Sequence, residues 1–187
     1  MGYRYGFKTE ANALANDVRA ELGLRSMDPL DPRELANHLE IPIWDVSSFT
    51  SEGSAILALL NGERASFSAA TVFAGHRRTI VHNDSHAQVR QHSNLAHELA
   101  HSLLQHPPTP ALDDQGCRDW NQDVEDEAEW LAGVLLIPED ATLSIVRLGW
   151  SKEDAAAHFG VSVSMVQRRL NATGAVKRVN RARSARG

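Results

Sequence analysis

The pattern of hydrophobic and polar residues in the first half of the chain predicts short helices followed by a small β-sheet. Apolar residues first recur at helical spacing and then give way to runs rich in β-branched and aromatic residues. In chain order the predicted segments are helices at 9–22 and 32–39, a strand at 41–46, and two strands within 67–84. Asp31 is placed to cap the second helix, because Pro32 follows at its first position. Ala74 and Gly75 separate the two later strands.

The second half of the chain is predicted to be mainly helical. Its segments are a helix at 85–106, a polar connection at 109–120 and a long helix at 121–137. Pro107 ends the first helix and Pro138 ends the second, because proline cannot continue the backbone hydrogen-bond ladder of a helix. We therefore predict an α+β fold that is mainly helical, with a small β-sheet beside the helix at 85–106.

Residues 150–170 predict two short helices joined by a turn at Gly160, a pattern similar to a helix-turn-helix. Ser151 and Ser162 are placed to cap the two helices. The expected inward face consists of Ala155, Ala156, Phe159, Val161, Val166 and Leu170. The residues in position to contact DNA are Gln167, Arg168 and Arg169. We favour instead a module that packs on the preceding domain and helps to dock a substrate.

The chain is expected to divide into a domain at 1–138, a helical subdomain at 139–174 and a basic tail at 175–187. The tail holds five basic residues and no acidic one, whereas the whole chain of 187 residues has a net charge of −5. A segment of this composition is expected to be disordered and solvated. Contact with nucleic acid through the tail is a possibility that we do not favour.

The overall composition is that of a soluble globular protein, with 42% hydrophobic and 23% charged residues. The single cysteine, Cys117, has no partner for an internal disulfide. The longest apolar run, residues 55–60, is too short to cross a membrane, and residues 1–25 lack the apolar core of a signal peptide. We therefore expect a cytoplasmic protein without a membrane partner.

The segment SNLAHELAHSLLQHPP, residues 93–108, carries the most specific chemistry in the chain. On a helix, His97 and His101 are offset by about 40° and about 6 Å, so both imidazoles can bind one metal ion. Glu98 projects from the flank of that face, where a carboxylate can accept a proton from a metal-activated water. His106 is expected to point away from the liganding face. The alternative interpretation is a helix with two surface histidines.

A third ligand is expected from the helix at 121–137. Zinc held by two histidines needs one more protein ligand and an open position for water. The sequence DVEDEAEWLAGVLLIP offers three glutamates, Glu125, Glu127 and Glu129, beside an apolar face. Spacing alone does not show which of the three glutamates is the ligand. The alternative interpretation is that none of them binds a metal and that they form a solvated acidic face of the helix.

The paired motifs resemble those of the ImmA/IrrE metallopeptidases and, more distantly, the thermolysin-like gluzincins. The resemblance rests on HELAH with SLLQH, followed by EDEAEWLAG and LLIP, and is expected to cover residues 10–172. It implies that His97 and His101 bind one Zn²⁺ per chain and that Glu98 is the general base. It also implies that Glu125, the first glutamate of the second motif, is the third ligand, with Glu127 as the alternative.

The resemblance extends to residues around the metal and to function. Glu129 occupies the position of a carboxylate that orients a liganding histidine from behind. Gluzincins stabilise the oxyanion with a downstream histidine or tyrosine; here His82 and His158 are the candidates, and the sequence does not choose between them. The family implies site-specific cleavage of a helix-turn-helix repressor, which derepresses mobile-element or stress-response genes. The rival interpretations are a DNA-binding regulator and a metal-dependent, antitoxin-like module that binds its partner without cutting it.

Overall fold

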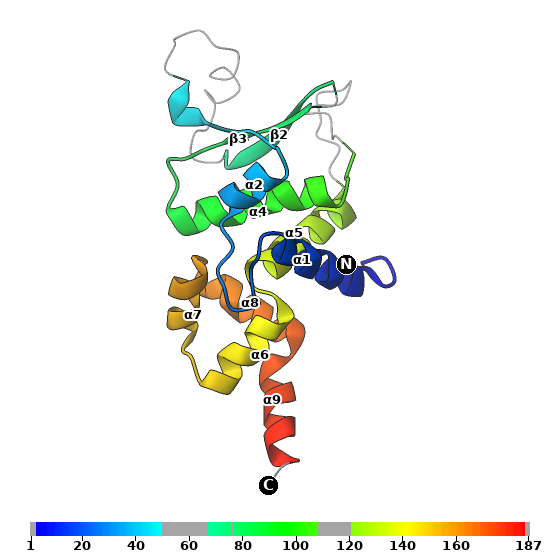
Figure 1. Cartoon of the computed structure of the whole chain (residues 1–187), viewed down its shortest axis with the longest axis vertical. Coiled ribbons are helices and arrows are strands. Elements are labelled where there is room, and N and C mark those ends of the chain that lie inside the picture. Colours follow the sequence, from blue (N-terminus) through cyan, green and yellow to red (C-terminus); the bar gives the residue numbers. More distant parts are fainter. Residues whose placement is uncertain (1–2, 50–66, 76, 108–120, 186–187) are drawn as a thin grey trace.

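The computed structural model describes residues 3–49, 67–75, 77–107 and 121–185. These residues form a mainly helical protein with one three-stranded sheet, which confirms the predicted α+β class. Figure 1 shows a stack of layers: the sheet, then helices α2 and α4, then α1 and α5, and last the group α6 to α9. In the described part of the chain, no helix combines the length and apolar character needed to cross a membrane.

The sheet has the strand order β1-β3-β2 and covers α4. Its strands are β1 (Ile43–Asp45), β2 (Ala69–Ala74) and β3 (Arg77–His82). β3 pairs parallel to β1 and antiparallel to β2, so β2 lies at the edge of the three strands. Gly75 has a φ of 64°, the left-handed conformation that glycine adopts without steric cost, and it turns the chain between β2 and β3 as the sequence predicts.

The helices of the first half begin and end close to their predicted positions. They are α1 (Phe7–Glu21), α2 (Pro32–His38) and α4 (Gln88–Leu103), with a short 3₁₀ turn η1 (Val46–Ser48) after β1. The Asp31 side chain accepts a hydrogen bond from the Arg33 amide, as expected of the residue that caps α2.

α4 and α5 (Gln122–Leu136) are held together by a shared apolar core. Leu95 and Leu99 of α4 and Leu131 and Leu135 of α5 are fully or almost fully buried. Each such side chain contributes about 1.5–3 kcal/mol on burial. This packing fixes which residues of the two helices face each other, and so it positions the site described below.

Arg19 is buried at the junction of α1, α5 and the loop after α1. Its guanidinium donates to the carbonyl oxygens of Leu135 (2.8 Å), Arg25 (2.8 Å) and Asp28. Burial lowers the pKa of Arg19, but the three carbonyls satisfy donors that would otherwise be left in an apolar core.

The last third of the chain forms four helices, joined to α5 by Pro138. They are α6 (Glu139–Leu148), α7 (Lys152–Phe159), α8 (Val163–Thr173) and α9 (Ala175–Ser184). Ser151 and Ser162 cap α7 and α8 by accepting from the amides of Asp154 and Met165, as predicted. Gly160, with a φ of 63°, makes the turn between α7 and α8. The division at residue 138 stays a prediction, because buried residues from α1 to α9 belong to one hydrophobic cluster.

The side chains of α8 that were considered for DNA contact are engaged within the protein. Arg169 is 3% exposed and donates from Nε to the carbonyl oxygen of Ile137 at 3.0 Å. Arg168 forms an ion pair with Glu129, and Gln167 accepts a hydrogen bond from Lys152 at 2.9 Å. α8 therefore packs on α5, α6 and α7 and turns these residues toward its neighbours.

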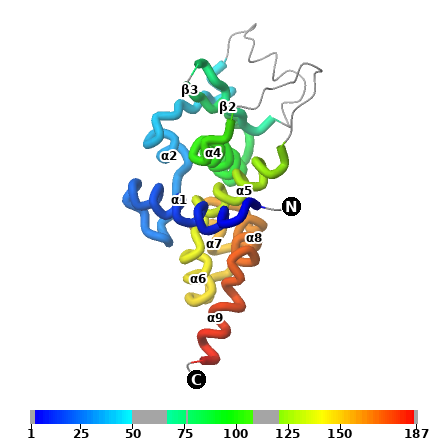
Figure 2. Tube along the Cα trace, turned by 90° about the vertical axis from the view of Figure 1, so that its right-hand side faces the viewer, coloured from blue at the N-terminus to red at the C-terminus, as the bar shows by residue number. Residues whose placement is uncertain are grey.

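The expectation that residues 175–187 are disordered is wrong for residues 175–184, which form helix α9. Ala175 and Val179 lie one turn apart and are buried against the rest of the molecule, where α9 packs on α6 and α8. Arg178 is paired with Glu139 of α6 at 2.6 Å. Figure 2 shows α9 running out to the C-terminus beyond the other helices. The prediction relied on the many basic residues of this segment and overlooked its narrow apolar stripe. Such a stripe is enough to pack a helix against its neighbours.

Candidate metal centre

Three side chains from two helices converge where α4 faces the start of α5. His97 and His101 lie one turn apart on α4, and Glu125 lies in the first turn of α5. His97 Nε2 lies 3.1 Å from Glu125 Oε2 and 3.1 Å from His101 Nε2, and His101 Nε2 lies 3.7 Å from Glu125 Oε2. Among the three predicted glutamates, Glu125 is the one that joins the two histidines as a group able to hold a metal ion.

Local sequence explains why Glu125 faces α4. Asn121 caps α5 by accepting from the amides of Asp123 and Val124, so the helix begins at Gln122. Glu125 then lies three and seven residues before Ala128 and Ala132, both buried, which places its side chain on the inward face of the helix.

The three donor atoms fit a zinc ion. Zinc bonds to imidazole nitrogen and carboxylate oxygen are about 2.0–2.2 Å long, so ligand atoms at the corners of a tetrahedron stand ~3.3 Å apart. The observed separations of 3.1–3.7 Å bracket this value. The side chains are 20–29% exposed, which leaves a side open for water and substrate. Hydrogen bonds from His101 and His97 lower the pKa of Glu125 to about 2, so its carboxylate is ionised, as a metal ligand must be.

Glu98 is held by the sheet. Its Oε2 atom accepts a hydrogen bond of 2.7 Å from the hydroxyl of Thr71, in the middle of edge strand β2. The sequence did not single out Thr71, because the hydrogen bond joins residues 27 positions apart and depends on how β2 lies over α4.

His106 contacts the metal centre, contrary to expectation. Gln105 has a φ of 54°, and the His106 amide donates to the carbonyl of His101 at 3.0 Å while the Gln105 amide donates to that of Ser102 at 3.1 Å. These two bonds and the left-handed residue make a Schellman motif, which folds the chain back over the last turn of α4. As a result His106 Nδ1 lies 2.9 Å from His101 Nδ1.

Glu127 lies behind His106 and does not join the cluster of ligands. Its Oε2 atom is 3.5 Å from His106 Nε2, and its Oε1 atom is 3.3 Å from the Nε of Arg4. Glu129, which was expected to orient a liganding histidine, forms an ion pair with Arg168 of α8. Glu127 therefore faces His106, which in turn contacts His101, whereas Glu129 faces α8.

The two histidines considered for oxyanion stabilisation have other partners. His82 is buried at the end of β3, where its Nδ1 lies 3.1 Å from Asp45 Oδ1 and burial lowers its pKa. His158 Nε2 donates a hydrogen bond to the carbonyl oxygen of Met27 at 2.7 Å, so its Nε2 carries the proton. The structure thus connects His82 to β1 and His158 to the loop before α2.

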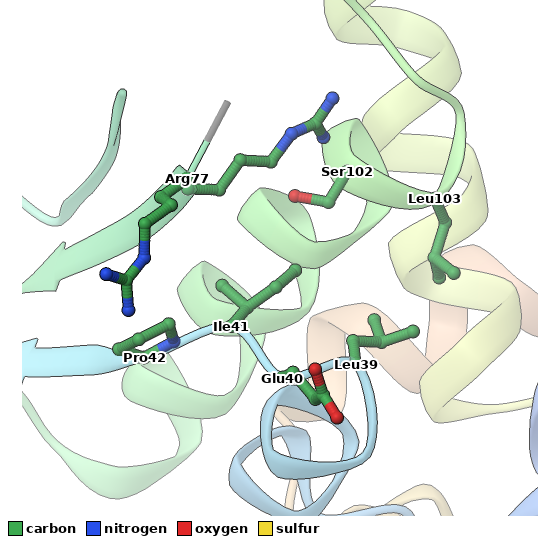
Figure 3. Close-up of a pocket in the computed structure, with 8 residues that line it drawn as sticks. Leu39, Glu40, Ile41, Pro42, Arg77, Ser102 and Leu103 are labelled. Atoms are coloured by element: carbon green, nitrogen blue, oxygen red, sulfur yellow. The ribbon is translucent and has the colours of Figure 1, made fainter. Parts of the chain in front are cut away.

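A cavity of about 370 Å³ adjoins the cluster, between α4, α5 and α8. Its walls include His97, Glu125, Asp126, Glu129, Met165 and Arg168. A larger hollow of about 500 Å³ lies between the end of α2, the start of β3 and the end of α4 (Figure 3). The larger hollow is lined by residues such as Ile41, Arg77 and Ser102 and by none of the three candidate ligands, so the smaller cavity is the one that matters for chemistry at the cluster.

Comparison with known families agrees with this geometry. Residues 59–171 match the model of the peptidase M78 family, described as the IrrE N-terminal-like domain. The chain belongs to this family, which supports a role as a peptidase and places it among the hydrolases. The matched segment contains the cluster, Glu98, Thr71 and His106, whereas α1, α2 and β1 lie before it. A search of curated proteins found no match.

Proposed function

We propose that this protein is a zinc-dependent endopeptidase that cuts a helix-turn-helix transcriptional repressor at one site and so derepresses mobile-element or stress-response genes. The observation that supports the chemistry is the convergence of His97, His101 and Glu125 at spacings suited to zinc, with Glu98 on the same helix. Membership of the peptidase family supports hydrolysis over mere binding.

His97, His101 and Glu125 would hold the ion, which when bound lowers the pKa of water and polarises the scissile carbonyl. Glu98 is the proton carrier: it accepts the proton of the attacking water and delivers it to the leaving amine. The hydrogen bond from Thr71 fixes one carboxylate oxygen of Glu98 and leaves the other free to take the proton. A carboxylate fixed in this way loses less orientational freedom at the moment of reaction.

The substrate is proposed to be a folded protein because the cavity at the cluster is shared by two parts of the chain. Met165 and Arg168 of α8 form its wall opposite Glu125 and Asp126 of α5. A partner that contacts α8 gains binding energy away from the scissile bond, and that energy can be used to position the bond. The preference for a repressor as that partner rests on the ImmA/IrrE resemblance.

The test uses the full chain loaded with zinc and a helix-turn-helix repressor as substrate, with the product of the adjacent reading frame examined first. The wild-type protein is expected to release two fragments of the repressor, identified by mass spectrometry, and to be nearly inert on casein. Glu98→Gln is expected to keep zinc and fold but to abolish cleavage, because an amide cannot accept the proton of water. Glu153→Gln, an exposed change on α7, is the matched control and should cleave normally.

The same experiment distinguishes the non-cleaving alternative. If the wild-type protein and Glu98→Gln release the repressor from DNA equally well and no fragments form, the protein acts by sequestration. Removal of zinc with a chelator should stop cleavage by the wild-type protein, and added zinc should restore it. Cleavage that persists at full rate in Glu98→Gln would refute the assigned general base.

A further inference from the structure

The two ring nitrogens of His101 have different surroundings. Nε2 faces His97 and Glu125, and Nδ1 faces His106 Nδ1 at 2.9 Å. If Nε2 offers its lone pair to a metal ion, the neutral ring must carry its proton on Nδ1. His101 is then the donor in the contact with His106, and His106 must accept through an unprotonated Nδ1.

This assignment also fixes the tautomer of His106. With Nδ1 as acceptor, the proton of the neutral His106 ring lies on Nε2, which points toward Glu127 Oε2 at 3.5 Å. The side chain of His106 is 9% exposed and that of Glu127 is 14% exposed, so water competes little for these positions.

We propose that His106 is a positioning residue that holds His101 in the tautomer and orientation required to bind the metal, with Glu127 holding His106 in turn. The inference rests on the proposed metal centre and goes beyond it, because neither residue is a ligand. A polar partner of this kind behind a liganding histidine typically changes metal affinity 10–100-fold.

The backbone around His106 shows that its place is built into the fold. The Schellman motif at the end of α4 sets His106 beside His101 through the left-handed Gln105, a conformation that residues with a side chain adopt only at an energetic cost. Glu127 is fixed on α5, and its other oxygen is paired with Arg4. A chain of contacts therefore runs from Arg4, before α1, through Glu127 and His106 to the candidate ligand His101.

The test measures zinc affinity of the full chain by competition with a chromogenic chelator, and the visible spectrum of the Co²⁺-substituted protein. His106→Phe keeps a buried ring but removes the acceptor; it is expected to bind zinc 10–100-fold more weakly and to alter the Co²⁺ absorption. His106→Gln offers an amide oxygen as acceptor and should recover most of the affinity. Gln105→Gly keeps the turn, because glycine favours positive φ, and should bind zinc as the wild-type protein does.

Each outcome is decisive for a different claim. Wild-type zinc affinity and Co²⁺ spectrum in His106→Phe would overturn the positioning role while leaving the metal centre intact. Failure of the wild-type protein itself to bind zinc would refute the metal centre. If His106→Phe does not fold, Glu127→Met serves in its place, because methionine removes the acceptor for His106 Nε2: it should weaken zinc binding about tenfold at full stoichiometry, and unchanged affinity would reject the role of Glu127.

Discussion

Glu125 and Glu127 lie two residues apart on α5, yet their carboxylates contact different histidines. Glu125 Oε2 is 3.1 Å from His97 Nε2, within the cluster of ligands, whereas Glu127 Oε2 is 3.5 Å from His106 Nε2, behind it. The two positions are about 200° apart around the helix, so both cannot face the same ion. The structure thereby separates two glutamates that spacing alone does not distinguish, and it agrees with the choice of Glu125 that the family resemblance implied.

Glu125→Gln and Glu127→Gln are expected to differ in zinc binding. Loss of the Glu125 carboxylate leaves two histidines, which seldom hold zinc tightly, so the protein should contain far less than one zinc per chain after dialysis. Glu127→Gln should retain one zinc per chain. Atomic absorption on the two purified variants checks this, and the reverse order would show that Glu127 is the third ligand.

Thr71→Val is expected to impair cleavage without loss of zinc. Valine has nearly the same shape as threonine but cannot donate the 2.7 Å hydrogen bond to Glu98. We expect kcat for the cognate substrate to fall about 10–100-fold, the range found when an orienting partner is removed. Thr71→Ser keeps the hydroxyl and should stay close to the wild-type rate. Equal rates for valine and serine would show that the hydrogen bond does not position Glu98.

His82 is expected to make stability depend on pH. Burial lowers its pKa in the folded protein below the ordinary value of 6.5, with Asp45 opposing part of this shift. Below pH 6.5 the unfolded chain therefore binds more protons at His82 than the folded protein does. The contribution of His82 to the free energy of unfolding is thus fully present above pH 6.5 and is lost as the pH falls below it. Urea unfolding at pH 7.5 and 5.5 should show a larger loss for the wild-type protein than for His82→Asn. Equal losses would contradict the prediction.

Arg168 and Arg169 are adjacent on α8, but substitution by methionine should reduce stability much more at Arg169 than at Arg168. Arg169→Met leaves the buried carbonyl of Ile137 without its donor and should cost about 1–3 kcal/mol in the free energy of unfolding. Arg168→Met breaks an exposed ion pair with Glu129 and should cost less than about 1 kcal/mol. Because Arg168 lines the cavity beside the cluster, its loss should change KM for the protein substrate more than it changes stability. Urea titrations and steady-state kinetics measure both effects.

α9 is expected to contribute to stability through its apolar stripe. Val179 is 3% exposed and Val176 is 49% exposed, so the same substitution tests a buried and an open position on one helix. Val179→Asp should destabilise the protein by roughly 2–4 kcal/mol, because an unpaired carboxylate replaces a buried methyl pair. Val176→Asp should leave the unfolding midpoint nearly unchanged. Equal, small effects would mean that α9 does not pack as described.

The sequence by itself determined the local features of this protein. The spacing of His97 and His101 places both on one side of any helix, because helical geometry is set within four residues. Ser151, Ser162 and Gly160 likewise act on their nearest neighbours, and their caps and turn are found as predicted. The order of helices and strands followed from periodicity and from proline, which also act locally.

Only the tertiary structure decided how those local pieces face one another. The choice of Glu125 depends on the rotation of α5 against α4, which the packing of Leu99, Leu131 and Leu135 sets. Thr71 reaches Glu98 because an edge strand lies over α4, and no pattern within either segment records that contact.

His106 and α9 show the same limit at the ends of helices. The spacing of residues on a continuous helix predicted that His106 points away from the ligands. In the structure, the left-handed Gln105 follows the end of α4 and folds the chain back, so that His106 lies beside His101. Charge content indicated a disordered tail, whereas Ala175 and Val179 find an apolar surface on α6 and α8. The energy of burial depends on what a side chain packs against, and that partner is supplied by the fold and not by the segment itself.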